Sequence, residues 1–203
     1  MLAARRGMGH VPMMEAFLAS TIFVTLAEIG DKTQLLAIVL AARFGRPLPI
    51  IAGIAVATLA NHALAAWAGT LAAGWLDGQG FRVALAAGFI AMAAWILVPD
   101  TLDDAEAPAT SARGAFLTTV IAFFFVEMGD KTQIATVALG AQYQQLLWVT
   151  SGTTLGMLIA NVPAVLFGQA LVRRIALVTV RRVAAAMFLV TGLWFGAEAL
   201  GWV

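Results

Sequence analysis

Six long apolar runs, separated by short polar breaks, make up most of the chain. They span residues 14–42, 48–74, 82–99, 115–140, 146–171 and 183–202. A membrane-spanning α-helix needs about 20 predominantly apolar residues, within a range of roughly 17–25. No run alternates apolar and polar residues in the way that is typical of a β-strand. The pattern therefore predicts an all-α integral membrane protein with six transmembrane helices.

Composition agrees with a protein that is embedded in lipid. Of the 203 residues, 62% are hydrophobic and only 11% are charged, whereas an average soluble domain has about 25% charged residues. A soluble fold of this composition would expose large apolar patches and aggregate. The net charge of +1 gives no electrostatic reason to expect a nucleic-acid partner. The chain has no cysteine, which excludes disulfides, thiolate metal sites and cysteine nucleophiles.

The two halves of the chain repeat each other at an offset of 99 or 100 residues. The matched positions are Glu28 and Glu127, Gly30 and Gly129, Asp31-Lys-Thr-Gln34 and Asp130-Lys-Thr-Gln133, and Asn61 and Asn161. Each copy holds three predicted spans. Because three is odd, the second copy enters the membrane from the side opposite to the first. We therefore predict two inverted three-helix repeats, an architecture that is typical of secondary transporters.

The predicted domain organisation follows from this repeat. Residues 1–13 form an N-terminal tail, residues 14–99 the first three-helix repeat, and residues 114–203 the second. Residues 100–113 form an acidic loop between the two repeats. The boundaries are placed where loop residues separate one apolar run from the next.

Loop arginines predict which side of the membrane each loop occupies. Three arginines lie on the side of the N-terminus, namely Arg5, Arg6 and Arg82. Seven lie on the opposite side, namely Arg43, Arg46, Arg113, Arg173, Arg174, Arg181 and Arg182. Because cytoplasmic loops carry an excess of basic residues, we expect the acidic central loop to be cytoplasmic and both termini to face outward. The short loops and the lack of an organellar transit peptide favour a bacterial inner membrane.

Charged residues interrupt the first and the fourth apolar runs at matching points. They are Glu28, Asp31, Lys32, Glu127, Asp130 and Lys131, and the two lysines are the only ones in the chain. One Lys or Asp at the centre of a span costs about 2.5–3.5 kcal/mol, so six such residues would together cost roughly 15–20 kcal/mol. A membrane protein that retains and duplicates such groups is expected to use them.

Spacing suggests how each motif is arranged. On a continuous helix Glu28, Asp31 and Lys32 would share one face. Gly30 between the carboxylates allows either the close approach of another helix or a local break, which would expose backbone carbonyls as further oxygen ligands. Gly129 has the same place in the second motif.

We expect the two motifs to meet across the pseudo-two-fold axis and to form one site. Its carboxylates would be supported by Lys32, Thr33, Gln34, Lys131, Thr132, Gln133, Asn61 and Asn161. Four carboxylates and two lysines leave a formal charge of −2, which a divalent cation neutralises. Carboxylate, amide and carbonyl oxygens suit calcium, manganese and magnesium rather than zinc or copper. Clustered carboxylates without the cation are expected to take up protons, and a site that holds either protons or a cation is the minimum requirement for an antiporter.

The alternative is that the motif has a purely structural role. Each Glu–Lys pair would then be an internal salt bridge, and each Asp would cap a broken helix. The duplication of the motif and the unneutralised charge of −2 favour the cation site.

The twin E-x-G-D-K-T motifs, Glu28-Ile-Gly-Asp-Lys-Thr33 and Glu127-Met-Gly-Asp-Lys-Thr132, resemble those of the Gdt family. This family, also called uncharacterised protein family sixteen, belongs to the second calcium/cation antiporter superfamily, and the resemblance covers nearly the whole chain. Its members are implicated in moving manganese and calcium out of the cytosol, with proton exchange as the proposed coupling. The resemblance implies that Glu28, Asp31, Glu127 and Asp130 are metal ligands. It also implies that the chain exports Mn2+ or Ca2+ in exchange for protons and needs no other cofactor.

Three other functions are alternatives to antiport. A divalent cation channel would move cations without a counterflux of protons. A rhomboid-type intramembrane enzyme needs a serine within the membrane, but Ser20, Ser111 and Ser151 lie near span ends or in loops, so we expect no enzymatic activity. A membrane assembly factor that transports nothing would leave the charge of −2 without a purpose.

Three further features of the sequence each have more than one interpretation. His62 follows Asn61 and could relay protons, although a lone histidine in a helical bundle is more often a packed, hydrogen-bonded residue. Glu198 could line the cation path or reach the membrane interface. The spacing Gly152-x-x-x-Gly156 permits close helix packing, and homo-oligomerisation is one use of such packing.

Overall fold

The computed structural model describes residues 13–75, 78–99, 114–168 and 176–202. Every regular element in these residues is an α-helix, which confirms the all-α prediction for this part of the chain. The helices are α1 (Met13–Glu28), α2 (Lys32–Phe44), α3 (Pro47–Trp75), α4 (Gln79–Ile96), α5 (Gly114–Glu127), α6 (Lys131–Tyr143), α7 (Leu146–Phe167) and α9 (Leu177–Ala199). The predicted tail up to residue 12, the acidic loop at 100–113, and Arg173 and Arg174 lie outside the described residues.

The described helices account for four or five of the six predicted membrane spans. Among the described helices, α3, α4, α7 and α9 are long and apolar enough to cross a membrane. Helices α1 and α2 together give a fifth candidate span, which is bent by 72° at a short break. Helix α5 is apolar but has only 14 residues, too few for a full crossing. The first and the fourth apolar runs are therefore each divided into two helices.

Both divisions fall at the glycine of the repeated motif. Gly30 has φ +84° and Gly129 has φ +81°, a left-handed conformation that glycine adopts without steric cost. Asp31 and Asp130 follow with extended backbones and precede the first turns of α2 and α6. Of the two uses predicted for Gly30, the local break is the one observed. The expectation that Glu28 and Asp31 share the face of one continuous helix is wrong, because the helix ends at Glu28.

The two halves of the chain pack against each other through matching contacts. A Cβ atom at Gly53 in α3 would lie 2.9 Å from the carbonyl oxygen of Phe116 in α5. A Cβ atom at Gly152 in α7 would lie 2.5 Å from the carbonyl oxygen of Phe17 in α1, and each of these residues is 99 positions from its counterpart. The first helix of each half thus packs against the third helix of the other half.

The spacing Gly152-x-x-x-Gly156 is used within the chain. A Cβ atom at Gly156 would lie 2.7 Å from the carbonyl oxygen of Thr21, so both glycines allow α7 to approach the backbone of α1. Small residues allow such close approach between helices in membranes. Because the packing of α1 on α7 already accounts for the two glycines, they give no evidence for homo-oligomerisation, which stays a prediction.

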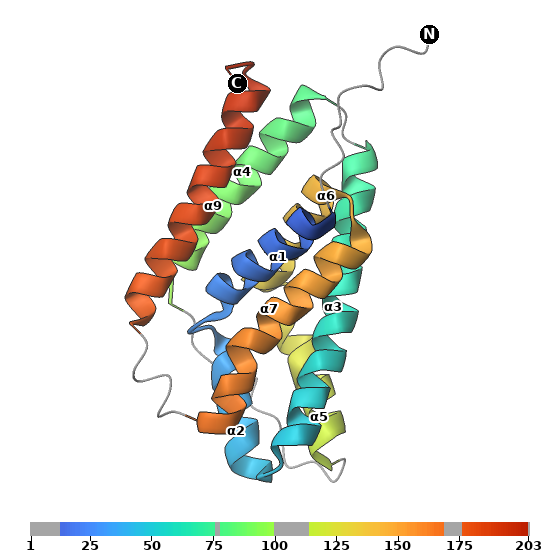
Figure 1. Ribbon diagram of the computed structural model, residues 1–203, viewed down its shortest axis with the longest axis vertical. Coiled ribbons are helices and arrows are strands. Elements are labelled where there is room, and N and C mark those ends of the chain that lie inside the picture. Colours follow the sequence, from blue (N-terminus) through green and yellow to red (C-terminus); the bar gives the residue numbers. More distant parts are fainter. Residues whose placement is uncertain (1–12, 76–77, 100–113, 169–175, 203) are drawn as a thin grey trace.

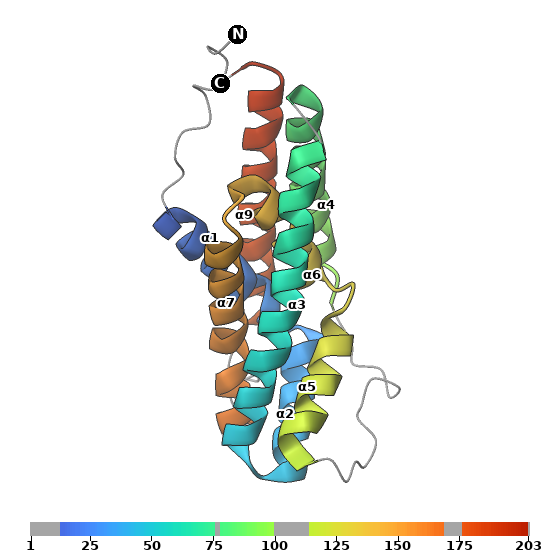
Figure 2. The ribbon, with the colours of Figure 1, turned by 90° about the vertical axis from the view of Figure 1, so that its right-hand side faces the viewer.

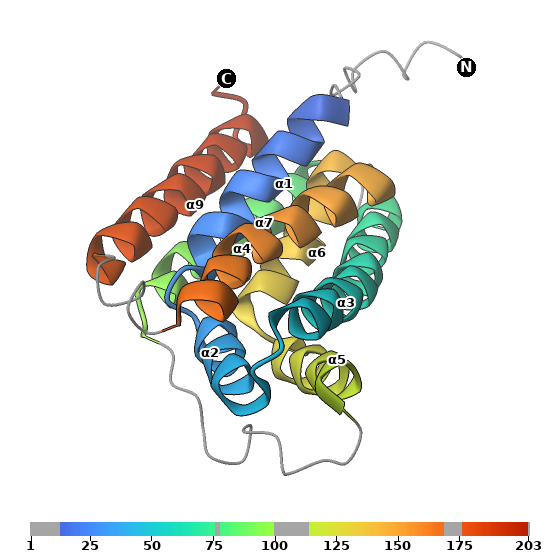
Figure 3. The same ribbon diagram turned by 60° about the horizontal axis from the view of Figure 1, so that its bottom comes forward.

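Helices α4 and α9 lie side by side (Figures 1 and 2) and contact α1 through an aromatic cluster. The ring of Phe23 in α1 lies 4.7 Å from that of Phe188 in α9 and 6.0 Å from that of Phe89 in α4, measured between centroids. Figure 3 shows α1 between α9 and α7, with which it makes contacts. The cluster fixes α1, whose last residue is Glu28, within the bundle.

Candidate cation site

The two motifs meet in the interior of the bundle, as the repeat predicts. One carboxylate oxygen from each of Glu28, Asp31 and Glu127 lies within 4.8 Å of those from the other two. All three side chains are buried, with at most 2% of their surface exposed. Among the described residues the group that meets this distance consists of these three, although Asp130 is also buried. The structure thus brings three of the four predicted ligands into one cluster, drawn from both halves of the chain.

Each glutamate of the cluster accepts a hydrogen bond through one of its two carboxylate oxygens. Asn161 Nδ2 donates to Glu28 Oε1 at 3.0 Å, and Thr132 Oγ1 donates to Glu127 Oε2 at 2.7 Å. The other oxygens, Glu28 Oε2 and Glu127 Oε1, are buried and have no hydrogen-bond partner among the described residues. Buried charged oxygens are costly unless they are paired or coordinate a metal. The arrangement therefore fits a cation that binds one oxygen of each glutamate.

Gln34 and Gln133 brace the two helix breaks rather than directing their oxygens at the carboxylate cluster. Gly30 N donates to Gln34 Oε1 at 3.1 Å, and Gly129 N donates to Gln133 Oε1 at 2.6 Å. Gln34 Nε2 in turn donates to the carbonyl oxygen of Ala160 in α7 at 3.0 Å. These bonds fix the backbone at the point where each Asp enters the site.

The two asparagines, which match each other in the repeat, have different partners. Asn161 contacts Glu28, and its amide oxygen has no hydrogen-bond partner among the described residues. Asn61 instead donates to the carbonyl oxygen of Phe124 and accepts a short hydrogen bond from Gln133 Nε2. An amide oxygen is therefore available as a ligand at Asn161 and already engaged at Asn61.

The two lysines also differ. Lys32 Nζ lies 3.7 Å from Asp130 Oδ1, in the motif of the other half. Lys131 is 2% exposed and donates to the carbonyl oxygen of Val98, just beyond the end of α4, at 2.9 Å. Lys32 thus balances the charge of Asp130, the predicted ligand outside the carboxylate cluster.

The structural interpretation of the motif predicts that Asp31 and Asp130 cap the helices that follow them, and the structure does not support this prediction. Asp31 and Asp130 precede α2 and α6, but neither side chain makes a capping hydrogen bond to the helix backbone. A side-chain cap would direct an oxygen at the backbone N–H groups of the first turn. The side chain of Asp31 contributes instead to the carboxylate cluster.

Three further residues lie at this site. The sequence does not decide the role of His62, and it gives no indication that Arg181 and Leu177 contact the first motif. His62 is fully buried, and its Nε2 lies 3.8 Å from Glu127 Oε2. Arg181 Nη2 donates to the carbonyl oxygen of Gly30 at 3.2 Å, and the side chain of Leu177 lies against the same glycine. The sequence indicates Arg181 only as one of the loop arginines, because nothing in it relates the start of α9 to the first motif.

Glu198→Gln is expected to leave cation transport at the wild-type level. Glu198 Oε1 accepts a hydrogen bond from Arg82 Nη1 at 3.2 Å, and the two side chains are 40% and 45% exposed. Exposed ion pairs contribute only about 0–1 kcal/mol, so thermal unfolding should change little as well. Flux measurements on the purified variant test this expectation, and loss of transport by a folded variant would place Glu198 on the cation path.

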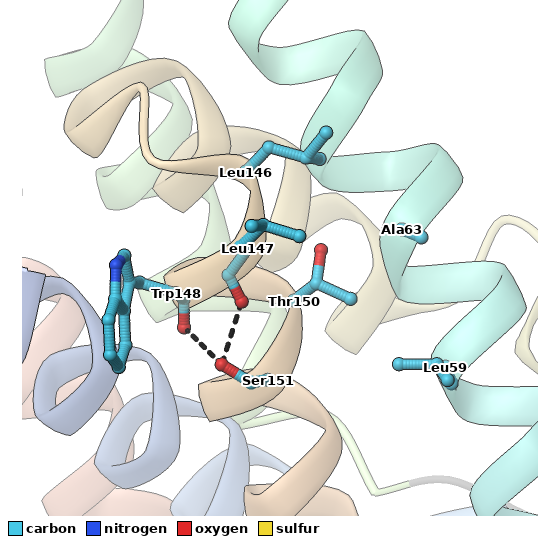
Figure 4. A pocket seen from close by; sticks show the side chains of 7 residues that line it. All are labelled: Leu59, Ala63, Leu146, Leu147, Trp148, Thr150 and Ser151. Atoms are coloured by element: carbon cyan, nitrogen blue, oxygen red, sulfur yellow. Dashed lines mark hydrogen bonds between the residues drawn. The ribbon is translucent and has the colours of Figure 1, made fainter.

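A groove of about 500 Å³ between α3 and α7 does not suit a cation. Figure 4 shows its lining, which consists of Leu59, Ala63, Leu146, Leu147, Trp148, Thr150 and Ser151. None of these residues is charged, and the hydroxyl of Ser151 donates to the carbonyl oxygen of Leu147 in its own helix at 2.7 Å. The carboxylate cluster is therefore the better candidate for the functional site.

Comparison with known proteins relates the chain to cation transporters. A model of the family described as "Divalent cation/proton antiporter GDT1" matches residues 16–104 and 115–202. A Vibrio cholerae protein named "Putative manganese exporter" is 52% identical over 182 residues, which cover 89% of this chain and 90% of the relative. A GDT1-like protein of Synechocystis is 28% identical over 197 residues, covering 87% and 94% of the two chains. GDT1-like protein 3 of Oryza sativa is 24% identical over 202 residues, covering 87% and 72%. No solved structure matches the chain.

Proposed function

The chain belongs to the GDT1 family of divalent cation/proton antiporters, and from this membership we propose that it exports Mn2+ from the cytoplasm in exchange for protons, with Ca2+ as a second substrate. As a member of this family it is a multi-pass membrane transporter of divalent cations and not an enzyme. The observation that carries the finer proposal is the buried cluster of Glu28, Asp31 and Glu127, to which both halves of the chain contribute.

The transported cation is the cargo of this site, and the mechanism needs no resident cofactor. Glu28, Asp31, Glu127 and Asp130 are the proposed ligands, and their oxygens suit Mn2+ and Ca2+. The formal charge of the four carboxylates and the two lysines is −2, so one divalent cation or two protons neutralise the site. Because the cation and the protons compete for the same oxygens, binding of one is coupled to release of the other.

We propose that the two halves are inverted repeats that together form six spans. The pair α1–α2 and the pair α5–α6 would each act as one broken span. The matching breaks at Gly30 and Gly129, and the matching contacts of α1 with α7 and of α5 with α3, support this arrangement. Transporters built from inverted repeats place their ion sites at such breaks and alternate access by moving one repeat against the other. The moving units would be residues 14–99 and 114–203.

The proposed cargo and location rest on the relatives and on the loop charges. Mn2+ is placed first because the Vibrio cholerae relative, 52% identical, is named a manganese exporter. The excess of loop arginines on one side supports a cytoplasmic position for the acidic loop at residues 100–113, with both termini outside. The membrane would be the inner membrane of a bacterium.

Proteoliposomes that contain the purified protein and a trapped pH indicator test the proposal. With an imposed proton gradient, addition of Mn2+ or Ca2+ should change the internal pH, and addition of Mg2+ measures selectivity. Empty liposomes and liposomes with the Asp31→Asn variant should show no such change. Entry of Mn2+ without a pH response would favour a channel over an antiporter, and the absence of any cation movement would contradict transport by this chain.

A further inference from the structure

His62 is a buried imidazole beside the carboxylate cluster for which the exchange of Mn2+ against protons gives no role. Its side chain is fully buried, and neither ring nitrogen has a hydrogen-bond partner among the described residues. A buried polar group without a hydrogen-bond partner destabilises the folded protein. The position therefore calls for a physical explanation beyond packing.

The distance between His62 and Glu127 suggests what the imidazole binds. Nε2 lies 3.8 Å from Glu127 Oε2, which is too long for a hydrogen bond. Two ligand atoms that each lie about 2.2 Å from one cation are separated by roughly 3–4 Å. Thr132 donates to the same carboxylate and holds it in place. Nε2 of His62 and Oε2 of Glu127 are therefore spaced as two donors to one cation on the Glu127 side of the site, although His62 lies outside the group of three carboxylates that meet within 4.8 Å.

The imidazole is present in one half of the site only. The residue that follows the matching asparagine in the second half is Val162, where the first half has His62 after Asn61. Glu28 is contacted by the amide of Asn161, whereas Glu127 is contacted by the hydroxyl of Thr132 and approached by His62. A nitrogen donor is thus added next to a single glutamate, although the motifs themselves are duplicated.

We propose that His62 is a specificity-determining residue that adds a nitrogen ligand to the cation site beside Glu127. This inference rests on the proposed function and deepens it. Ca2+ and Mg2+ take oxygen ligands, whereas imidazole is a common ligand of transition metals. Mn2+ suits oxygen ligands as well, but as a first-row transition metal it is also bound by sites with nitrogen donors. An imidazole added beside Glu127 is therefore expected to favour Mn2+ over Ca2+ and Mg2+.

Pulsed electron paramagnetic resonance on bound Mn2+ tests the inference directly. The tag-free protein in detergent, loaded with Mn2+, should show the electron spin-echo modulation of a nitrogen-14 nucleus that is bonded to the metal. The chain has two histidines, His10 and His62. The His10→Gln variant should keep this modulation and the His62→Gln variant should lose it. Retention in His10→Gln of a modulation typical of an imidazole nitrogen assigns that nitrogen to His62, the other histidine, even if His62→Gln does not fold.

Selectivity gives a second readout that loss of packing alone would not produce. In His62→Gln the affinity for Mn2+ should fall about tenfold while that for Ca2+ changes less than about twofold, since only the transition metal loses a preferred donor. A purely structural role would lower both affinities together, and this outcome would overturn the inference. Mn2+ bound to the wild type without nitrogen modulation would also overturn it and leave the proposed function standing. Absence of Mn2+ binding to the wild type would overturn both.

Discussion

Replacing Asp31 with asparagine is expected to abolish cation transport while the protein still folds and inserts. Asp31 is 2% exposed, and one of its oxygens lies within 4.8 Å of the nearest oxygens of Glu28 and Glu127. The amide has nearly the same shape as the carboxylate but no charge, so the formal charge of the site changes from −2 to −1. Changes in residues that merely orient a metal ligand cost 10–100-fold, so loss of a ligand should lower transport by about 100-fold or more.

The same substitution should spare the helix break. Asparagine is as good as aspartate at the residue that precedes a helix, and the Asp31 side chain makes no capping hydrogen bond in any case. The left-handed turn is made by Gly30 and braced by Gln34. Elution of the variant as a single species in size-exclusion chromatography, with Mn2+ flux then measured in proteoliposomes, separates loss of function from loss of fold.

Asp130→Asn is expected to give the same loss by a different route. Asp130 lies 3.7 Å from Lys32, so its removal would release the positive charge of Lys32 toward the carboxylate cluster. A lysine ammonium there would compete with the cation for the same oxygens. The Glu198→Gln variant, which changes a carboxylate outside the site, serves as the matched control. Wild-type transport by either Asp31→Asn or Asp130→Asn would contradict the assignment of the site.

Repetition in the sequence was sufficient to predict that Glu28 and Glu127 meet. The two residues are 99 positions apart, and no local pattern relates them, but a duplicated polar motif in apolar runs can bury its charges only by pairing the two copies. The all-α architecture followed from the length of the runs alone. Both predictions depend on burial of whole segments, which composition determines.

The conformation at Gly30 could not be decided from sequence. Glycine serves equally where two helices approach closely and where a helix breaks, and this chain uses both: Gly53 and Gly152 allow close approach, whereas Gly30 and Gly129 have positive φ. The difference depends on what lies next to each backbone. The expected shared helix face at Glu28 and Asp31 failed for this reason.

The side chains that each motif contacts are the other feature that could not be predicted from the repeat. Matching sequence positions predict equivalent roles, yet Lys32 faces Asp130 while Lys131 donates to a backbone carbonyl. Some residues that contact the first motif have no counterpart in the repeat. Arg181 donates to the carbonyl oxygen of Gly30, whereas a Cβ atom at Gly129 would have none of the described atoms within 4 Å. Within the described residues the two motifs therefore have different contacts.

Gly69→Ala is expected to destabilise the protein strongly, although it adds a single methyl group. A Cβ atom at Gly69 in α3 would overlap the carbonyl oxygen of Val137 in α6 and lie 2.7 Å from the backbone nitrogen of Ala141. A Cβ atom at Gly140 would lie 2.5 Å from the carbonyl oxygen of Ala66, so the two backbones are in direct contact. Backbone atoms of two helices cannot move aside as a flexible side chain can, and overpacking typically costs about 1–3 kcal/mol.

The consequence should extend to the cation site, because α6 begins with the second motif. A displaced α6 would move Thr132 away from Glu127 and Gln133 away from Asn61. Gly74→Ala in the same helix is the matched control, since a Cβ atom there has none of the described atoms within 4 Å. Alanine favours helix over glycine by up to about 1 kcal/mol, so this control should unfold at the wild-type temperature or slightly above it. Thermal unfolding in detergent, with Mn2+ flux measured in parallel, should show a lowered transition and reduced flux for Gly69→Ala alone. Equal stability of the two variants would mean that α3 and α6 do not pack backbone to backbone, and that the second motif is held by other contacts.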